Sequence, residues 1–299
     1  MRSTQKFAVA CAITLILIAC SAGAWSQTNP DRMTISELAK QTHFHGIAVD
    51  PQDSARIYLA THHGFFAVSP DGTATRLSTT RDDFMGFTLH PSDPGTLYAS
   101  GHPAEGGNLG FVVSTDGGKT WRQISPGVSG PVDFHQMTVS PADPKTIFGA
   151  YAGALQVSRD NGRTWALVGP APDRLIDLAA SSVDVNRLYA ATQAGLLQSA
   201  DGGRTWTEAF ALNRPATMVE VTPTGHVYAF VIGNGLIHAA EPNLGWQNLA
   251  NSWGEDYLLH LAADEKDPNR LYAVSGKSGI VASSDGGKTW TSFGRAPRR

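Results

Sequence analysis

The sequence predicts an all-β protein, a six-bladed β-propeller built from four-stranded antiparallel blades. The stretch Ser114 to Trp121 reads Ser-Thr-Asp-Gly-Gly-Lys-Thr-Trp, and it returns three more times with its Ser, Asp, Gly, Thr and Trp in place. Repetition at a period of about forty residues is typical of propeller blades. The 299 residues show no long helical periodicity, and each unit is too small to bury a core alone. These observations favour a propeller over a sandwich.

The repeated octapeptide is predicted to form a tight hairpin turn between two strands. Its Asp accepts hydrogen bonds from backbone N–H groups of its own turn, and its Gly residues permit positive φ. The Trp that ends it offers a large ring to the neighbouring repeat. We therefore assign structural roles to the four Asp and four Trp residues: Asp116, Asp160, Asp201, Asp285, Trp121, Trp165, Trp206 and Trp290.

Each unit follows the same order along the chain. An apolar strand ends near a Pro, as in Ile47 to Pro51, and a second strand is built on an apolar–aromatic pair such as Ile57-Tyr58. A third strand leads into the octapeptide position and a fourth leaves it. Counting these landmarks predicts six blades, and a seventh blade formed by the N-terminal segment is the alternative.

Residues 1–24 are expected to be an export signal, because Arg2 and Lys6 precede a short unbroken apolar run. A lipobox that ends at the lipidated Cys20 is favoured over cleavage after Ala24. Residues 25–42 are predicted to be a tether and N-terminal segment, and 43–299 the propeller. We expect a periplasmic or cell-envelope lipoprotein, or a secreted protein, with no transmembrane helix in the mature chain. The formal charge of −3 argues against a nucleic-acid partner.

The four octapeptides resemble the Asp-box, or BNR, repeat of sialidases, the sortilin propeller and photosystem II assembly-factor propellers. The resemblance covers roughly Phe44 to Gly294. It implies a propeller, whereas its relatives include enzymes, receptors and assembly factors, so it does not select a function. BNR-repeat proteins of this kind are often named as glycosyl hydrolases.

Blade geometry places the octapeptide turns on one face and two other sets of loops on the opposite face. In blades one to three, the start of the first strand reads His43-Phe44-His45, Asp83-Phe84-Met85 and Asp133-Phe134-His135. Alternation about the central Phe puts its two neighbours on the same side of the strand. The loop after the second strand adds further histidines. The predicted ligands on this face are His45, His62, His63, Met85, His102 and His135.

Imidazole and thioether without thiolate suit copper, which is our first expectation, and imidazole alone also accepts zinc or nickel. His43, Asp82, Asp83 and Asp133 are predicted to orient the imidazoles from behind, the acids alternatively binding harder ions. A single histidine near a strand start is more often structural, and it is the shared registers that favour a site. The remaining histidines, His90, His226, His238 and His260, are expected to be structural, with His260 facing the blade interior.

A sialidase is disfavoured because no Arg-Ile-Pro occurs and no Arg triad can be assembled from equivalent positions. Besides ligand or metal binding, three other functions stay open. A glycosidase that acts on envelope carbohydrate would use Asp83 and Asp133 as its pair of carboxyl groups. A metal-dependent lyase or hydrolase would use the histidines. A non-catalytic scaffold would bind a protein partner, and a small molecule, metal or protein is the ligand expected at the channel mouth.

Overall fold

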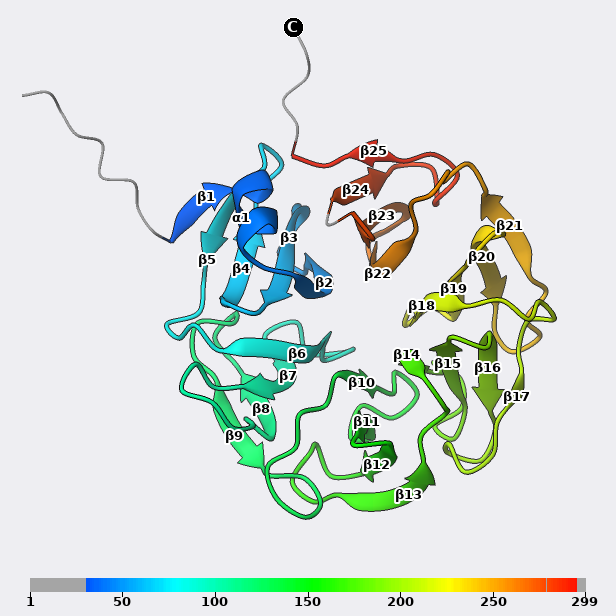
Figure 1. The fold of residues 1–299 in the computed structure, drawn as a ribbon, viewed down its shortest axis with the longest axis horizontal. Helices are drawn as coiled ribbons and strands as arrows, with labels where there is room; N and C mark the ends of the chain where they lie inside the picture. Colours follow the sequence, from blue (N-terminus) through cyan, green and yellow to red (C-terminus); the bar gives the residue numbers. More distant parts are fainter. Residues whose placement is uncertain (1–30, 278, 295–299) are drawn as a thin grey trace, which may run out of the picture.

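The computed structural model describes residues 31–277 and 279–294, which form six antiparallel sheets around a central channel (Figure 1). The predicted six-bladed β-propeller is therefore confirmed. The expected export signal and Cys20 lie outside the described residues, so export and lipidation stay predictions. No helix within the described ranges has the length and apolar character needed to span a membrane.

The blades follow one another along the chain; in blades two to six the first strand lies at the channel and the last at the rim, whereas in blade one β2 lies at the channel and β1 is outermost (Figure 1). Blade one contains β1 (Arg32–Thr34), β2 (Phe44–Asp50), β3 (Asp53–Thr61), β4 (Gly64–Val68) and β5 (Thr73–Arg76). Blade two contains β6 (Asp83–Leu89), β7 (Leu97–His102), β8 (Phe111–Ser114) and β9 (Arg122–Ser125). Blade three contains β10 (Gln136–Val139), β11 (Ile147–Tyr151), β12 (Ala154–Ser158) and β13 (Ala166–Pro170).

The second half of the ring repeats this plan, with outer strands of only two residues in blades four and six. Blade four contains β14 (Leu175–Ala180), β15 (Leu188–Thr192), β16 (Leu196–Ser199) and β17 (Thr207–Glu208). Blade five contains β18 (Ala216–Val221), β19 (His226–Val231), β20 (Gly235–Ala240) and β21 (Gln247–Ala250). Blade six contains β22 (Leu258–Asp264), β23 (Asp267–Ser275), β24 (Ile280–Ser283) and β25 (Thr291–Ser292).

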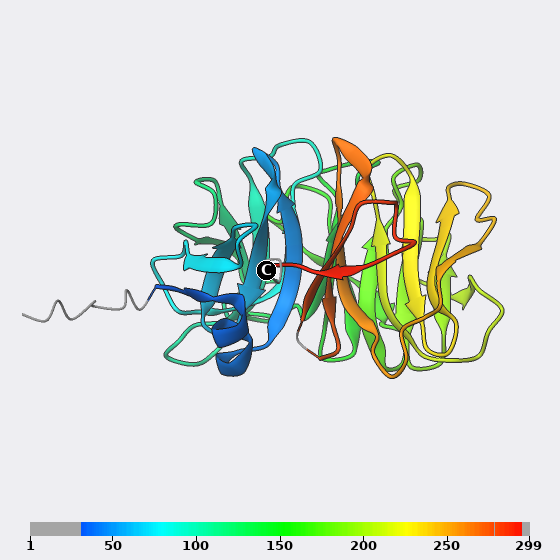
Figure 2. The same ribbon diagram turned by 90° about the horizontal axis from the view of Figure 1, so that it is seen from above.

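Residues 32–41, expected to be part of the tether, form a strand and a helix attached to blade one. Strand β1 pairs with β5, and α1 (Ile35–Gln41) follows it along the flank of the blade (Figure 2). Thr34 caps the helix through a reciprocal capping box with Glu37, while Ile35 and Leu38 are buried in the core of this blade. A segment this short adds one strand to an existing sheet and does not build a seventh blade.

The Asp-box turns form the hydrogen bonds that the sequence predicts. In the box of blade two, Asp116 Oδ1 accepts from the Thr120 N–H at 3.0 Å, and Oδ2 accepts from the Thr120 hydroxyl at 2.6 Å. The Ser114 hydroxyl accepts from the Gly118 N–H at 2.9 Å. The same bonds recur around Asp160, Asp201 and Asp285. Each carboxylate is thus fully engaged in holding its own turn.

The Asp-box tryptophans connect these turns to the start of the first strand. The ring of Trp121 lies 4.6 Å from that of Phe84, and the ring of Trp165 lies 4.7 Å from that of Phe134. Both Phe residues are completely buried. Because these rings point into the blades, the residues on either side of Phe84 and Phe134 are free to face the channel.

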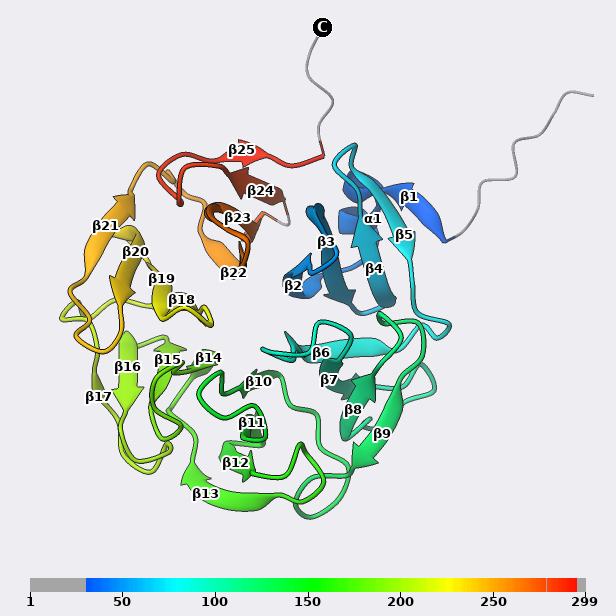
Figure 3. The same cartoon turned by 180° about the vertical axis from the view of Figure 1, so that it is seen from behind.

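The ring closes between blades six and one, whose inner strands β2 and β22 are in contact (Figure 3). The Lys266 ammonium donates to the Pro51 carbonyl at 2.6 Å, and the Tyr272 hydroxyl donates to the Ser54 carbonyl at 2.8 Å. Phe293 packs against the same core as α1. Side-chain packing and these two hydrogen bonds therefore close the disc.

Candidate functional site

A cavity of about 540 Å³ lies at the channel mouth on the face opposite the Asp-boxes. Five of the six predicted ligands line it, namely His45, His62, Met85, His102 and His135. His43 also lines the cavity, and its ring lies 5.6 Å from that of His62. The remaining predicted ligand, His63, is exposed and lies outside the lining.

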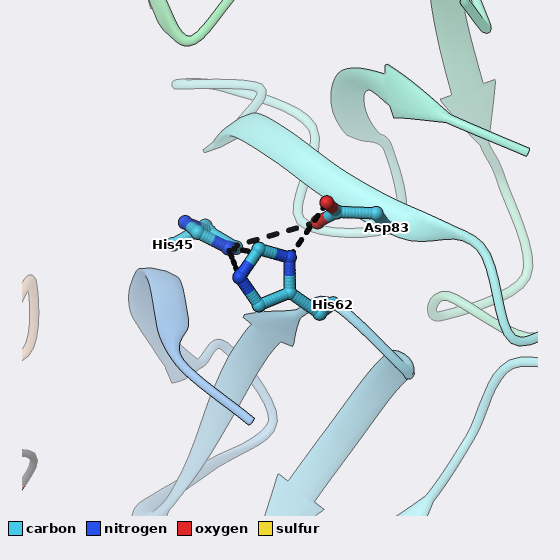
Figure 4. A group of neighbouring side chains, drawn as sticks. All are labelled: His45, His62 and Asp83. Carbon is cyan, nitrogen blue, oxygen red and sulfur yellow. Dashed lines mark hydrogen bonds and ion pairs between the residues drawn. The ribbon is translucent and has the colours of Figure 1, made fainter. Parts of the chain in front are cut away.

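The first group in this cavity joins blades one and two (Figure 4). His62 Nδ1 lies 2.7 Å from Asp83 Oδ2, which is the distance of a charge-assisted hydrogen bond. His45 Nε2 lies 3.1 Å from His62 Nε2 and 3.7 Å from Asp83 Oδ1. One ligand atom from each of these three side chains lies within 4.8 Å of the others. We call these residues group one.

The second group joins blades two and three. His102 Nε2 lies 3.0 Å from Asp133 Oδ2, and His135 Nε2 lies 2.5 Å from the same oxygen. The other ring nitrogen of His102 donates to the Gly107 carbonyl at 2.8 Å, which leaves Nε2 of the neutral ring as the ligand atom. These three side chains, called group two, also meet within 4.8 Å. Each group therefore contains two imidazoles and one carboxylate.

The two groups differ in their electrostatics. Burial lowers the pKa of His45 to about 4, with Asp83 acting in the opposite direction and the neighbouring His62 reinforcing the decrease. The hydrogen bond with Asp133 raises the pKa of His135 above its ordinary value. His45 is consequently neutral at pH 7 and has a lone pair available to an ion.

One oxygen of each carboxylate lacks a hydrogen-bond partner. Asp83 Oδ1 and Asp133 Oδ1 are both buried atoms that accept no hydrogen bond from any part of the chain the structure describes. The Asp133 residue is only 5% exposed. Leaving a buried acceptor unpaired costs about 1–3 kcal/mol. The two groups thus share the same unsatisfied carboxylate oxygen.

Several neighbours hold the groups in place. The N–H of Ala104 donates to Asp82 Oδ1 at 3.0 Å, so Asp82 holds the loop that follows His102. Within the described residues Asp82 makes no hydrogen bond to an imidazole, contrary to the prediction that it orients one. The His62 N–H donates to the Thr42 hydroxyl at 3.0 Å. A β-bulge between Phe44 and Gly46 leaves His45 as the extra residue at the start of β2. Bulges commonly direct side chains next to functional sites.

Three further titratable residues line the opposite wall of the cavity, and sequence reasoning missed them. Asp177 comes from β14, Glu220 from β18 and His260 from β22. His260 was expected to face the blade interior, but a bulge between Leu258 and His260 shifts the register and brings it to the channel. Simple alternation from the Pro landmarks cannot detect that shift.

The comparison with known families fits this architecture. A family model described as BNR/Asp-box repeat matches residues 112–123, which contain the box of blade two. The other three boxes repeat both its sequence and its hydrogen bonds. The chain is a six-bladed propeller that contains the BNR/Asp-box repeat. No curated protein sequence matches it.

Solved structures similar to this Asp-box propeller share its fold at low identity. The GH74 enzyme of Niastella koreensis has a TM-score of 0.59 and 17% identity, over 84% of this chain and 45% of that one. The GH74 xyloglucanase of Xanthomonas campestris has a TM-score of 0.56 and 18% identity, over the same shares of the two chains. YCF48 from Cyanidioschyzon merolae has a TM-score of 0.50 and 19% identity, over 84% of each chain.

These similarities show the fold alone. The propeller spans less than half the length of the two GH74 enzymes. Its own cavity is lined by six histidines and three acidic residues, with Asp133 in contact with two of those histidines. Among the described residues, no Lys or Arg lines that cavity.

Proposed function

We propose that this Asp-box propeller binds divalent transition-metal ions, one in group one and one in group two. The observation that carries the proposal is the repeated set of two imidazoles and one carboxylate, each with a buried carboxylate oxygen that accepts no hydrogen bond from the described residues. A structural histidine–aspartate pair does not need a second histidine pointing at the same acid. Two such groups lie side by side at one cavity, presented by adjacent blades, which supports the same ion-binding role for both.

The separations between ligand atoms support this proposal. Two ligands bound to one tetrahedral ion at about 2.1 Å lie about 3.4 Å apart. In group one, His45 Nε2 lies 3.1 Å from His62 Nε2 and 3.7 Å from Asp83 Oδ1. In group two, the ligand atoms of His102 and Asp133 lie 3.0 Å apart. Small side-chain adjustments would bring either group to coordination distance.

The ligand types bear on which metal is bound. Copper was the first expectation because Met85 supplies a thioether, and Met85 does line the cavity. The side chains that meet within each group, however, are imidazole and carboxylate, a set that suits zinc and also accepts copper(II) or nickel. We therefore favour zinc, with copper as the second candidate.

The glycosidase hypothesis receives less support from the same geometry. Asp83 and Asp133 would have to flank a sugar as acid and base or nucleophile. Each is instead held by imidazoles, and Asp133 is almost completely buried. A general acid also needs access to the glycosidic oxygen, which Asp133 lacks. A protein partner at the channel mouth remains compatible with bound metal.

Metal analysis of protein purified without an affinity tag tests the proposal. After dialysis against zinc, and separately against copper, we expect two ions per chain. His45→Ala and His135→Ala should each retain one ion, and the double variant none. The matched control is His90→Ala, since His90 accepts hydrogen bonds from a turn outside the cavity lining. Absence of stoichiometric metal from the unaltered protein would overturn the proposal.

A further inference from the structure

The wall opposite the two groups carries acidic side chains that the proposed metal sites do not use. Asp177 and Glu220 line the same cavity of about 540 Å³ as the histidines. Glu220 also lines a second cavity of about 340 Å³, which opens toward the Asp-box face. Glu220 therefore stands at the neck where the two halves of the channel meet.

Neither side chain has a cationic partner among the residues that the structure describes. Asp177 accepts hydrogen bonds from the backbone N–H groups of Leu178 at 2.9 Å and Val219 at 3.0 Å. Glu220 makes no hydrogen bond or ion pair within the described ranges, and the charged group that acts on it is Asp177. Group one and group two differ in this respect, because their carboxylates lie against imidazoles.

In the part of the chain that the structure describes, the other titratable groups around the pair are mostly histidines and acids, with Lys266 as the one lysine. His260 faces the cavity from β22, and the groups that face it from blades one to three are His43, His45, His62, Asp83, His102 and His135. The second cavity is lined by Lys266, whose ammonium donates to the Pro51 carbonyl, and by five further titratable residues: Asp50, His90, Asp93, Asp264 and Glu265. No neighbouring cation therefore compensates an ionised Glu220.

Burial raises the pKa of Asp177 to about 7, against the two backbone hydrogen bonds, which lower it. Burial raises the pKa of Glu220 to about 8, and the nearby Asp177 adds to the increase. Without metal, both carboxyls hold protons through much of the neutral range. The cavity is then spared two uncompensated negative charges.

Metal ions reverse this charge balance. Two divalent ions, each bound by two neutral imidazoles and one carboxylate, would leave the cavity with two excess positive charges. Two further carboxylates on the facing wall cancel them. Building on the proposed function, we propose that Asp177 and Glu220 are the counter-charges of the metal sites, which lose their protons to solvent when the cavity fills. Metal binding by this propeller is then coupled to proton release.

Proton release can be counted by titrating zinc chloride into metal-free protein in a calorimeter at pH 6.5. Two buffers with different ionisation enthalpies separate proton transfer from binding. At this pH the two carboxyls together hold about 1.7 protons, given their raised pKa values, and we expect the loaded protein to release them. Glu220→Gln should release about one proton fewer than the unaltered protein. The decrease for Asp177→Asn should be somewhat smaller, because its carboxyl holds less than a full proton at pH 6.5.

The matched control is Glu208→Gln, which alters an exposed residue of β17 and should release as many protons as the unaltered protein. Variants that bind two zinc ions and release the same number of protons as the unaltered protein would overturn the inference and leave the proposed function standing. Failure of the unaltered protein to bind zinc would overturn the proposed function itself. Unfolding curves of each variant confirm that it is folded.

Discussion

Acidification should destabilise the metal-free propeller in part through His260. Burial in the channel wall lowers the pKa of His260 from 6.5 to about 4, although a hydrogen bond to the Phe44 backbone opposes the decrease. The folded protein therefore favours the neutral ring. This contribution to stability is fully present above pH 6.5, the unfolded value, and is lost as the pH falls toward 4.

The size of the effect follows from the two pKa values. A difference of one unit is worth about 1.4 kcal/mol, so full protonation of His260 costs about 3.5 kcal/mol of folding free energy. By pH 4.5 most of this loss has occurred, about 2.5 kcal/mol. Such a loss is a large fraction of the stability of an ordinary domain, which is about 5–15 kcal/mol.

Urea unfolding of the chelator-treated protein between pH 7.5 and 4.5 measures this contribution. His260→Gln removes the titrating ring and keeps a side-chain N–H for the Phe44 backbone. Because the other titrating groups are common to both proteins, the difference between their pH dependences isolates His260. We expect the variant to lose about 2–3 kcal/mol less than the unaltered protein over this range. Equal losses in both proteins would refute the burial of a neutral ring.

Two further predictions concern the Asp-boxes. Gly162→Ala should lower the free energy of unfolding by about 2–4 kcal/mol, because it strains a backbone at φ +77° and drives a Cβ into the Phe111 ring. Gly153→Ala has the same φ and open space around it, so a thermal melt should show a smaller loss, and equal losses would contradict the clash. The Thr164 hydroxyl and N–H lower the pKa of Asp160 to about 2, so its carboxylate contributes stability above pH 3.8 that disappears as the pH falls toward 2. Asp160→Asn should therefore show a smaller decrease in melting temperature between pH 4 and pH 2, and an unchanged decrease would contradict this contribution.

Much of the blade plan could be predicted from the sequence because the landmarks repeat. Counting the Asp-boxes and the Pro-ended strands gave six blades, and the structure contains six. The central Phe84 and Phe134 are buried as predicted, and Asp83 and His135 line the channel cavity, although β10 begins only at Gln136, one residue after the predicted Asp133-Phe134-His135 strand start. A period of two residues holds wherever the strand is regular.

The rest of the cavity depends on irregularities that repeats do not reveal. An extra residue shifts the register between Leu258 and His260, and another does so between Leu175 and Asp177. One such residue reverses the face on which the following side chains lie. Glu220 lies deeper in the channel, at a position where its counterparts in blades two and three are Thr88 and Thr138. No composition or spacing rule singles it out.

The Asp-boxes contribute to the site although they lie on the opposite face. The Trp165 ring packs between Phe111 of blade two and Phe134 of blade three. Phe134 lies between Asp133 and His135 in the chain. The Asp-box of blade three therefore helps to fix the strand start that presents group two. The Asp-box turn thus stabilises the fold and also helps to position Asp133 and His135.

A crystal structure of the zinc-loaded protein, with anomalous scattering recorded at the zinc edge, tests the central claim most directly. Our account predicts two anomalous peaks in the channel mouth. One should lie among His45, His62 and Asp83, and the other among His102, Asp133 and His135, at bond lengths of about 2.0–2.2 Å. A loaded crystal without a peak in the cavity, or with zinc bound only elsewhere on the surface, would contradict it.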